Sequence, residues 1–250
     1  MSKKTILITG ASGGIGSALA RHYARPEVTL LLWGRDTARL EETAAACRTR
    51  GARCIVESFD LRDAAMQAAH LAAADAATPI DIAIFNAGLG GTVPDGVAAE
   101  TVEASRAVAE VNFVAPVTGA NAMAAAMSGR GRGQIVLIGS IAESFPLPMA
   151  PTYAATKAGL RMFADALGIR LARHGVSVTL VSPGFIDTAM SRQVTEPKPF
   201  LMSADKAAVI VARGVARNAR AIVVPWQFAA IRFLTSLLPR ALLRLVLSRV

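Results

Sequence analysis

The sequence predicts an α/β protein built on a doubly wound parallel sheet with helices on both faces. Short apolar or β-branched runs alternate with longer Ala-, Leu- and Arg-rich segments. This alternation is typical of parallel strands joined by crossover helices. Several runs are apolar throughout, as in strands covered on both faces. Glycine and proline follow the strand runs, which indicates ligand-binding loops at the carboxyl edge of the sheet.

Each predicted strand is a short run that ends in turn-forming residues. A helix is expected to open near Ile15, and a longer one over 150–173, because both segments are rich in helix formers. The strand runs, in chain order, are TILIT (5–9), VTLLLW (28–33), CIVES (54–58), DIAIF (81–85), QIVLIGS (134–140), VSVTLVS (176–182) and AIVVP (221–225).

Length and composition favour a single domain with a sizeable core, since the chain has 250 residues and is 53% hydrophobic. We expect this domain to span 1–225, with 226–250 as an apolar, basic helical extension of it. The two cysteines lack CxxC spacing and the three histidines are scattered, so neither a metal site nor a disulfide framework is expected. The expected location is the cytoplasm. The longest apolar stretch is interrupted by Arg232, which argues against a membrane span.

The first loop carries three spaced glycines, Gly10, Gly14 and Gly16, between the first strand and the first helix. Glycines there let the backbone approach a pyrophosphate, and the helix N-terminus supplies unpaired N–H groups. The spacing is G-x-x-x-G-x-G, so a tight turn without a ligand remains the alternative. A dinucleotide is the favoured ligand because a strand precedes the glycines and a helix follows them.

Arg35 and Asp36 end the second strand, where a dinucleotide fold reads the adenosine ribose. An acidic residue there favours the free 2′-hydroxyl of NAD, whereas an arginine favours the 2′-phosphate of NADP. Asp36 has another role available as the N-cap of the helix that follows. We therefore favour Arg35 and NADPH, with a solvated surface arginine as the alternative.

Tyr153 and Lys157 lie one turn apart on one face of the predicted helix 150–173. A phenol needs about three pKa units, or roughly 4 kcal/mol, to ionise at neutral pH. A neighbouring ammonium supplies that much only in a partly desolvated cleft. Ser140 ends a strand and could hydrogen-bond a carbonyl oxygen beside the phenol, although a strand-end serine is also an ordinary turn residue.

These motifs together resemble those of the short-chain dehydrogenase/reductase family, a group of Rossmann-fold NAD(P)-dependent oxidoreductases. The resemblance covers about residues 3–190. It rests on TGASGGIG (9–16), Asp60-Leu61, the NAG motif (86–88), Asn112, Ser140, Tyr153-x-x-x-Lys157, Pro183-Gly184 and Thr188.

The resemblance implies a role for each matching residue. Tyr153 would be the general acid/base, Ser140 would orient the substrate, and Lys157 would lower the pKa of the phenol and hold the nicotinamide ribose. Asn112 would hold a water of the proton relay. The remaining cofactor-binding residues would be Gly10, Ser12, Gly14, Ile15, Gly16, Arg35, Asp60, Leu61, Asn86, Ala87, Gly88, Pro183, Gly184 and Thr188.

The C-terminal segment 226–250 departs from many relatives. It is apolar and arginine-bearing, and two short helices are expected there, the second beginning near Pro239. The sequence from residue 191 onward contains ten basic and two acidic residues, so most of the net charge of +9 lies in this part. The tail could lie on an anionic membrane, cover a substrate pocket, pack against a second subunit in a homodimer, or pack on the body with solvated arginines.

Two function classes follow. The favoured one is an NADPH-dependent reductase of small-molecule carbonyls, or the reverse alcohol dehydrogenase, with an apolar or lipid-like substrate. That substrate is suggested by Phe145, Met149, Phe185, Met190, Phe200 and Met202, which would equally serve as core. The alternative is a non-catalytic dinucleotide-binding protein that docks a partner through its basic tail. Nucleic-acid binding is not expected, because aromatic residues make up 5% of the chain and do not alternate with the basic ones.

Overall fold

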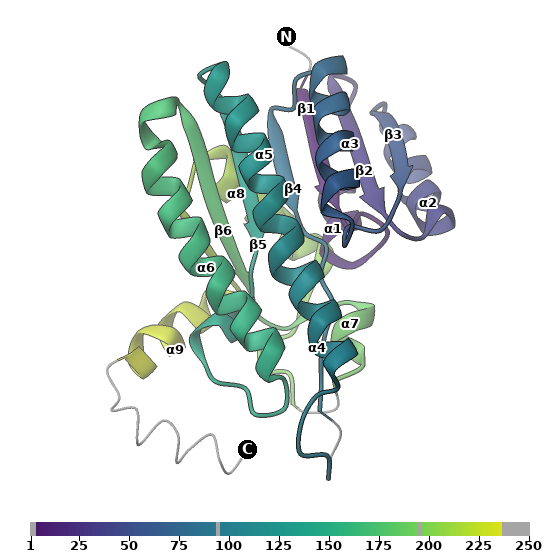
Figure 1. The fold of residues 1–250 in the computed structure, drawn as a ribbon. Coiled ribbons are helices and arrows are strands. Elements are labelled where there is room, and N and C mark those ends of the chain that lie inside the picture. Colours follow the sequence, from purple (N-terminus) through teal and green to yellow (C-terminus); the bar gives the residue numbers. More distant parts are fainter. Residues whose placement is uncertain (1–3, 94–95, 195–196, 237–250) are drawn as a thin grey trace.

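The computed structural model describes residues 4–93, 96–194 and 197–236 and shows one parallel sheet between two layers of helices (Figure 1). The sheet strands are β1 Lys4–Thr9, β2 Val28–Gly34, β3 Arg53–Ser58, β4 Ile82–Phe85, β5 Gly133–Ile138, β6 Val176–Pro183 and β9 Ala221–Val224. The α-helices are α1 Gly14–Tyr23, α2 Thr37–Arg48, α3 Ala64–Ala77, α4 Val102–Ala109, α5 Ala115–Gly129, α6 Pro151–Leu171, α7 Ala189–Arg192, α8 Ala204–Ala216 and α9 Gln227–Ser236.

All seven predicted strand runs form strands, and they assemble in the order β3-β2-β1-β4-β5-β6-β9. Every pairing in this sheet is parallel. The chain moves outward from β1 to β3 on one side, then returns to place β4 on the other side of β1. This reversal is the switch point beside which open α/β sheets bind ligands, at the carboxyl ends of the strands.

Two hydrophobic layers cover the sheet. In Figure 1, α3, α5 and α6 lie in front of the sheet, and α1 and α8 lie behind it. On the first face Leu71, Met123 and Leu160 pack against buried strand residues, and on the second Leu19 and Val211 do so. Because side chains of a strand alternate between faces, strands buried on both sides need apolar residues at successive positions. The continuous apolar runs of the sequence are thereby explained.

Helix starts follow local capping chemistry. Asp36 accepts a hydrogen bond from the backbone N–H of Arg39 and caps α2, as the sequence predicted. Asp63 caps α3 through the N–H of Met66. The long helix predicted over 150–173 is α6, which begins at Pro151, a residue that suits the first turn.

Some elements were not expected from the sequence. Residues Ile186–Asp187 (β7) and Met202–Ser203 (β8) form a small separate parallel pair, and Glu110–Val114 (η1) is a π-helical turn between α4 and α5. Two 3₁₀ turns, Ile141–Ser144 (η2) and Ala172–His174 (η3), flank α6. The first predicted tail helix is present as α9, whereas the second lies outside the described residues.

Among the described residues, no helix is both long and apolar enough to cross a bilayer. Within the same part of the chain, His, Cys, Asp and Glu side chains form no cluster that could hold a metal ion.

Candidate active site

The predicted site residues gather at the carboxyl edge of β1, β4, β5 and β6, the middle of the sheet. The loop after β1 carries the glycines, the loop after β4 the NAG motif, and the loop after β5 leads from Ser140 into η2. Since parallel strands all end at the same edge, residues more than a hundred positions apart meet there.

The glycine loop packs tightly against the NAG motif. A Cβ on Gly10 would lie 2.8 Å from the Cα of Ala87, and one on Gly16 would overlap the Gly10 carbonyl oxygen. Gly10 and Gly14 have φ values of 65° and 55°, in the left-handed region that favours glycine. The loop therefore needs glycine for its own path, and α1 starts immediately after it.

This loop fits a dinucleotide pyrophosphate. Helix α1 begins at Gly14 without a side-chain cap and without an acidic residue in its first turn, so its N-terminal N–H groups are available to an anion. Ser12 and Ile15 are both partly exposed there. A Cβ on Gly14 would come within 3.2 Å of the Cγ2 of Thr188, so Thr188, which follows β6 in the chain, lies beside the same loop.

Asn86 and Thr9 connect the loop after β1 with the loop after β4. The Asn86 side-chain amide donates to the carbonyl oxygens of Thr9 at 3.0 Å and Gly10 at 3.2 Å. The Thr9 hydroxyl accepts from the backbone N–H groups of Asn86 and Ala87. Asn86 is predicted to line the cofactor pocket, and in the structure its amide holds the glycine loop against the end of β4. The sequence did not single out Thr9, whose position directly before the glycines was the available signal.

At the end of β2, Asp36 and Arg35 have different surroundings. Asp36 is engaged as the α2 N-cap, whereas Arg35 is exposed and close enough to Asp60 to lower its pKa. Arg39 was missed by the sequence analysis. Its guanidinium lies beside the glycine loop, because a Cβ on Gly13 would be 2.5 Å from Arg39 Nη2. Its position in the first turn of the helix that follows Arg35 was the available signal.

Asp60 and Leu61 follow β3. The Asp60 carboxylate accepts hydrogen bonds from Arg62, at 3.0 Å from its backbone N–H and 2.8 Å from Nε. These bonds hold the pKa of Asp60 below its usual range. Leu61 is buried. The adenine contact that the family resemblance implies for Asp60 thus involves a carboxylate already bound by an arginine.

Asn112 lies in the π-helical turn η1 and is fully buried. Its amide bonds the backbone of Leu89 twice, accepting from the N–H at 2.7 Å and donating to the carbonyl at 2.9 Å. Asn112 therefore fixes the loop that follows the NAG motif. A Cβ on Gly88 would lie 3.4 Å from Asn112 Oδ1 and 3.8 Å from Lys157 Nζ, which places both side chains beside Gly88.

Ser140 and Tyr153 are brought together from the end of β5 and the first turn of α6. Ser140 is buried, and its hydroxyl accepts from the N–H of Ala142 at 3.1 Å. Tyr153 is partly buried, and desolvation raises its pKa, while a hydrogen bond with Ser140 lowers it and the charge of Glu143 raises it further. A hydroxyl pair of this kind can bind one carbonyl oxygen and supply a proton.

Lys157 is 4% exposed, and its Nζ lies 5.6 Å from the centre of the Tyr153 ring. The ammonium donates to the Ile138 carbonyl oxygen at 3.0 Å. Burial lowers the pKa of Lys157 to about 8, with the carboxylate of Glu143 acting in the opposite direction. The effect of Lys157 on the pKa of Tyr153 stays a prediction: desolvation is the largest influence on the phenol and raises its pKa, and the ammonium donates to a backbone carbonyl.

The segment after β6 closes the site on its other side. Gly184 donates its N–H to Val224, and a Cβ on Gly184 would overlap the ring of Phe228 in α9. Thr188 caps α7 and forms a reciprocal capping box with Ser191. Pro183, Gly184 and Thr188 are thereby placed in one short segment, held from behind by β9 and α9.

Glu143 is a further buried charge that the sequence analysis missed. It lies three residues after Ser140 in η2, and its side chain has no exposed surface. Ser182 and Arg232 both bond its Oε1, at 2.8 and 3.2 Å. An acidic residue inside the loop that follows a buried strand was the only available signal, and such loops commonly carry solvated acids.

Comparisons with known proteins agree with this geometry. Residues 4–199 match the family model described as short chain dehydrogenase. The chain is 30% identical over 243 residues to an uncharacterized oxidoreductase of Myxococcus xanthus, with 97% of this chain and 95% of that protein covered. It is 33% identical over 204 residues to the ketoacyl reductase HetN of Nostoc sp., with 79% and 70% covered.

A solved structure gives the same result in three dimensions. The short-chain dehydrogenase from Sphingobium yanoikuyae in complex with NADPH superposes with a TM-score of 0.82 at 28% identity. The match covers 95% of this chain and 97% of that one. The resemblance therefore extends over the whole sheet and both helical layers.

Proposed function

The chain belongs to the short-chain dehydrogenase family of oxidoreductases, and from this premise we propose that it is an NADPH-dependent reductase that converts a ketone to an alcohol, or the reverse. The observation that carries the proposal is the placement of the buried Ser140 hydroxyl, close enough to Tyr153 to lower the pKa of its phenol, together with the buried ammonium of Lys157, 5.6 Å from the Tyr153 ring. A protein that only bound a dinucleotide would have no use for a phenol paired with a hydroxyl donor and a buried cation.

In the proposed reduction, the substrate carbonyl oxygen accepts hydrogen bonds from the hydroxyls of Ser140 and Tyr153. A nicotinamide cofactor, when bound, would supply the hydride to the carbonyl carbon. Tyr153 transfers its proton to the oxygen as negative charge develops there. Ser140 lies in the turn after β5 and Tyr153 lies in the first turn of α6, so the fold brings the two hydroxyls to one edge of the sheet before the substrate arrives.

Lys157 stabilises the phenolate that this proton transfer leaves. With its pKa at about 8, most of the ammonium is charged at neutral pH, and the low-dielectric surroundings strengthen its attraction for a phenolate. The same ammonium has three N–H donors, so it would donate to the nicotinamide ribose as well as to the Ile138 carbonyl oxygen. Asn112 lies next to Lys157, beside Gly88. It would hold a water of the relay that returns a proton to Tyr153 after each turnover.

The preference for NADPH rests on the cations around the end of β2. Arg35 is exposed there, Arg39 lies against the glycine loop, and Asp36 is engaged as a helix cap. A 2′-phosphate would meet two guanidinium groups, whereas the 2′-hydroxyl of NADH would lack a free carboxylate acceptor at this place. The NADPH complex of the Sphingobium relative supports this choice.

An apolar or lipid-like ketone is the proposed substrate class. Met190 of α7 lies against Gly90, because a Cβ added to Gly90 would be 3.4 Å from the Met190 Cγ. Phe200 and Leu201, the two residues directly before β8, each expose about half of their surface. Phe185 packs on the Phe228 ring and serves the core. The ketoacyl reductase activity in the name of the Nostoc relative supports a carbonyl on an acyl chain.

Self-association is part of the proposal. Met162 and Ile169 lie seven residues apart on α6 and expose 71% and 77% of their surface. Residues at this spacing share one helix face, and a second copy of the chain would cover them. The membrane and substrate-cover alternatives for 226–250 concern a segment that lies mostly outside the described residues.

The test is turnover of a panel of short- and long-chain ketones with NADPH and with NADH, for the wild type and Tyr153→Phe. We expect reduction of the ketones, faster with NADPH, and a loss of about 10²- to 10⁴-fold in kcat for the variant because only the proton donor is removed. Cofactor binding by the variant, followed by nicotinamide fluorescence, should remain. Turnover of Tyr153→Phe near the wild-type rate would refute the assignment of the general acid.

A further inference from the structure

Glu143 is a buried carboxylate that the proposed chemistry does not use. It sits in η2, and its backbone N–H bonds the carbonyl oxygen of Ser140 at 3.0 Å. The side chain is fully enclosed, and a Cβ added to Gly139 would lie 2.8 Å from its Oε2. The carboxylate is therefore packed against the same turn that presents the Ser140 hydroxyl to Tyr153.

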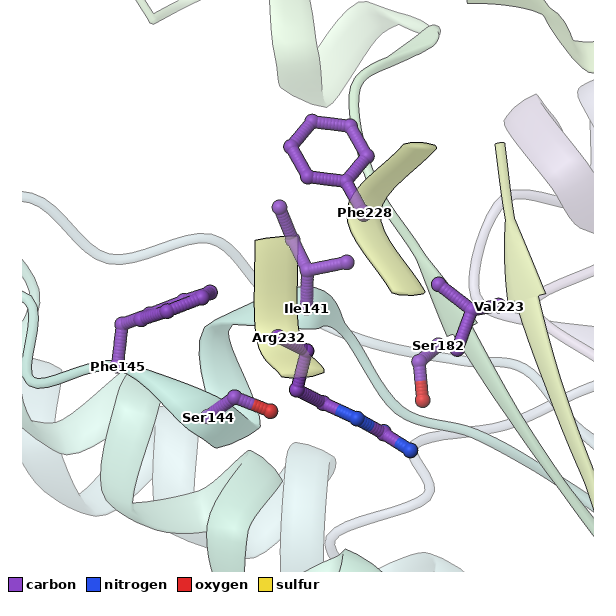
Figure 2. Close-up of a pocket in the computed structure, with 7 residues that line it drawn as sticks. All are labelled: Ile141, Ser144, Phe145, Ser182, Val223, Phe228 and Arg232. Atoms are coloured by element: carbon purple, nitrogen blue, oxygen red, sulfur yellow. The ribbon is translucent and has the colours of Figure 1, made fainter. Parts of the chain in front are cut away.

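The partners of Glu143 come from other elements than its own. Ser182 of β6 donates to Oε1 at 2.8 Å, and Arg232 of α9 donates to the same oxygen at 3.2 Å. Figure 2 shows Arg232 extending from α9 toward Ser182, with Ile141 and Ser144 of η2 in the same close-up. Oε2 and the Ser144 hydroxyl have no hydrogen-bond partner within the described part of the chain.

Helix α9 is held against the site at a second point, one turn before Arg232. Phe228 is 5% exposed and fills the space that a side chain on Gly184 would need. Its ring makes edge contacts with Phe185 and Phe200, at centroid distances of 6.2 and 5.6 Å. One helix thus contacts both the turn after Ser140 and the segment after Pro183.

The charged and titratable groups that face Glu143 belong to three elements. Arg232 lies on α9, Arg161 and Lys157 on α6 with Tyr153, and Ser182 on β6. Burial raises the pKa of Glu143, while Ser182, Arg232 and Arg161 act to lower it. The negative charge in turn raises the pKa values of Tyr153 and Lys157. Glu143 therefore favours the protonated form of both groups in the proposed proton transfer.

We propose that Glu143 is a positioning residue of the Ser140–Tyr153–Lys157 site, and that Arg232 holds it there as a carboxylate, so that helix α9 sets both the geometry and the charge around the catalytic phenol. The inference rests on the proposed function for its meaning in turnover. Its physical content is a chain of contacts from Arg232 of α9 through the Glu143 carboxylate to the turn that carries Ser140, and the effect proposed for Tyr153 can be tested without a substrate.

Titration of the tyrosines tests the link without turnover. The chain has two tyrosines, so ¹³Cζ-tyrosine labelling gives two NMR signals whose pH dependence can be followed separately. In Glu143→Gln, which keeps the shape and an acceptor oxygen, we expect Tyr153 to titrate at lower pH than in the wild type. Tyr23 belongs to the helical layer of α1 and α8, across the sheet from the layer of α6, and should be unaffected.

Glu41→Gln is the matched control, because it removes the same charge from an exposed ion pair with Arg48 on α2. It should leave the Tyr153 titration where it is in the wild type. An unchanged Tyr153 titration in Glu143→Gln, with the Tyr23 signal preserved, would overturn the proposal. A shift of equal size in Glu41→Gln would also overturn it, since the effect would then be one of net charge.

The role of α9 is tested by a double-mutant cycle. Arg232→Gln should lower the urea midpoint of unfolding in the wild-type background, because it leaves a buried carboxylate without its cation. The same substitution should have a much smaller effect in Glu143→Gln, and Arg232→Lys should restore part of the midpoint. Additive effects of Arg232→Gln and Glu143→Gln would show that the two residues do not act as a pair.

Kinetics connect the link to the proposed function. The limb of the pH profile of kcat/KM that follows Tyr153 should move to lower pH in Glu143→Gln, in step with the NMR titration. A profile that stays in place while the titration shifts would overturn the catalytic meaning of the link. If the wild type reduced no ketone, the proposed function would fail, and the titration and the cycle would still decide whether Glu143 acts on Tyr153.

Discussion

The glycine loop after β1 and the turn after β5 lie at the same edge of the sheet, yet different interactions hold them in place. The first is fixed by backbone packing and neutral hydrogen bonds, with Gly16 against Gly10 and Asn86 bonded to both Thr9 and Gly10. The second encloses ionisable side chains, namely Tyr153, Lys157 and Glu143.

This difference indicates how each half supports its task. A pyrophosphate needs close backbone approach and free N–H groups, and these peptide groups are neutral, so no ionised side chain has to be buried to provide them. Proton transfer needs side chains whose pKa lies near the working pH, and burying such side chains carries a cost in folding free energy. The catalytic side should therefore show strong pH dependence, and the nucleotide side should show sensitivity to shape.

The largest effect expected is on the catalytic side, at Lys157. Its folded pKa of about 8 is below the unfolded value of 10.5, so the unfolded chain binds more protons between these values. The cost of burying the ammonium is fully present below pH 8 and is relieved as pH rises toward 10.5. Relative to Lys157→Met, the wild type should gain about 3 kcal/mol of unfolding free energy across this range.

Urea unfolding of both proteins at pH 7 to 10.5 measures this gain. The comparison uses the change with pH, since Lys157→Met also removes the bond to the Ile138 carbonyl and so shifts stability by a constant amount. Lys206→Met, which replaces an exposed lysine, is the control and should run parallel to the wild type. Parallel curves for Lys157→Met would mean that the ammonium is not desolvated by folding.

The next effect belongs to the nucleotide side. Arg35→Ala should weaken NADPH binding by about 1.5 to 3 kcal/mol and spare NADH, because a charged hydrogen bond to the 2′-phosphate is lost. Isothermal titration with each cofactor gives the two affinities. Asp36→Ala is the neighbouring control: it should cost about 1 kcal/mol of stability through loss of the α2 cap and leave the cofactor preference intact. Equal wild-type affinity for NADPH and NADH would contradict the assignment of Arg35.

The smallest effect separates shape from charge. Gly16→Ala should destabilise the protein by about 1 to 3 kcal/mol and weaken cofactor binding, since its Cβ overlaps the Gly10 carbonyl. The effect should not vary with pH between 7 and 10. Gly129→Ala, at the end of α5 with open space around the added carbon, should instead stabilise by about 0.4 to 1 kcal/mol. Thermal unfolding of both variants checks this, and a stability loss in Gly129→Ala equal to that of Gly16→Ala would contradict it.

The sequence alone determined the sheet and most of its ligand-facing loops. Continuous apolar runs predicted all seven strands of the main sheet, because burial on both faces demands apolar residues at successive positions. Local chemistry predicted the cap at Asp36 and the helix that carries Tyr153 and Lys157. Each of these features depends on residues that are close in the chain or on the regular spacing of apolar residues, and both are visible in the sequence.

The tertiary structure alone decided what surrounds the catalytic phenol. Glu143 meets Ser182, 39 positions away, and Arg232, 89 positions away, and a charge in a loop carries no sign of such partners. The direction of the Tyr153 pKa was likewise beyond a spacing argument, since desolvation depends on every element packed around the ring. Spacing could place the ammonium of Lys157 one turn from the phenol, whereas only the packed fold directs it at the Ile138 carbonyl.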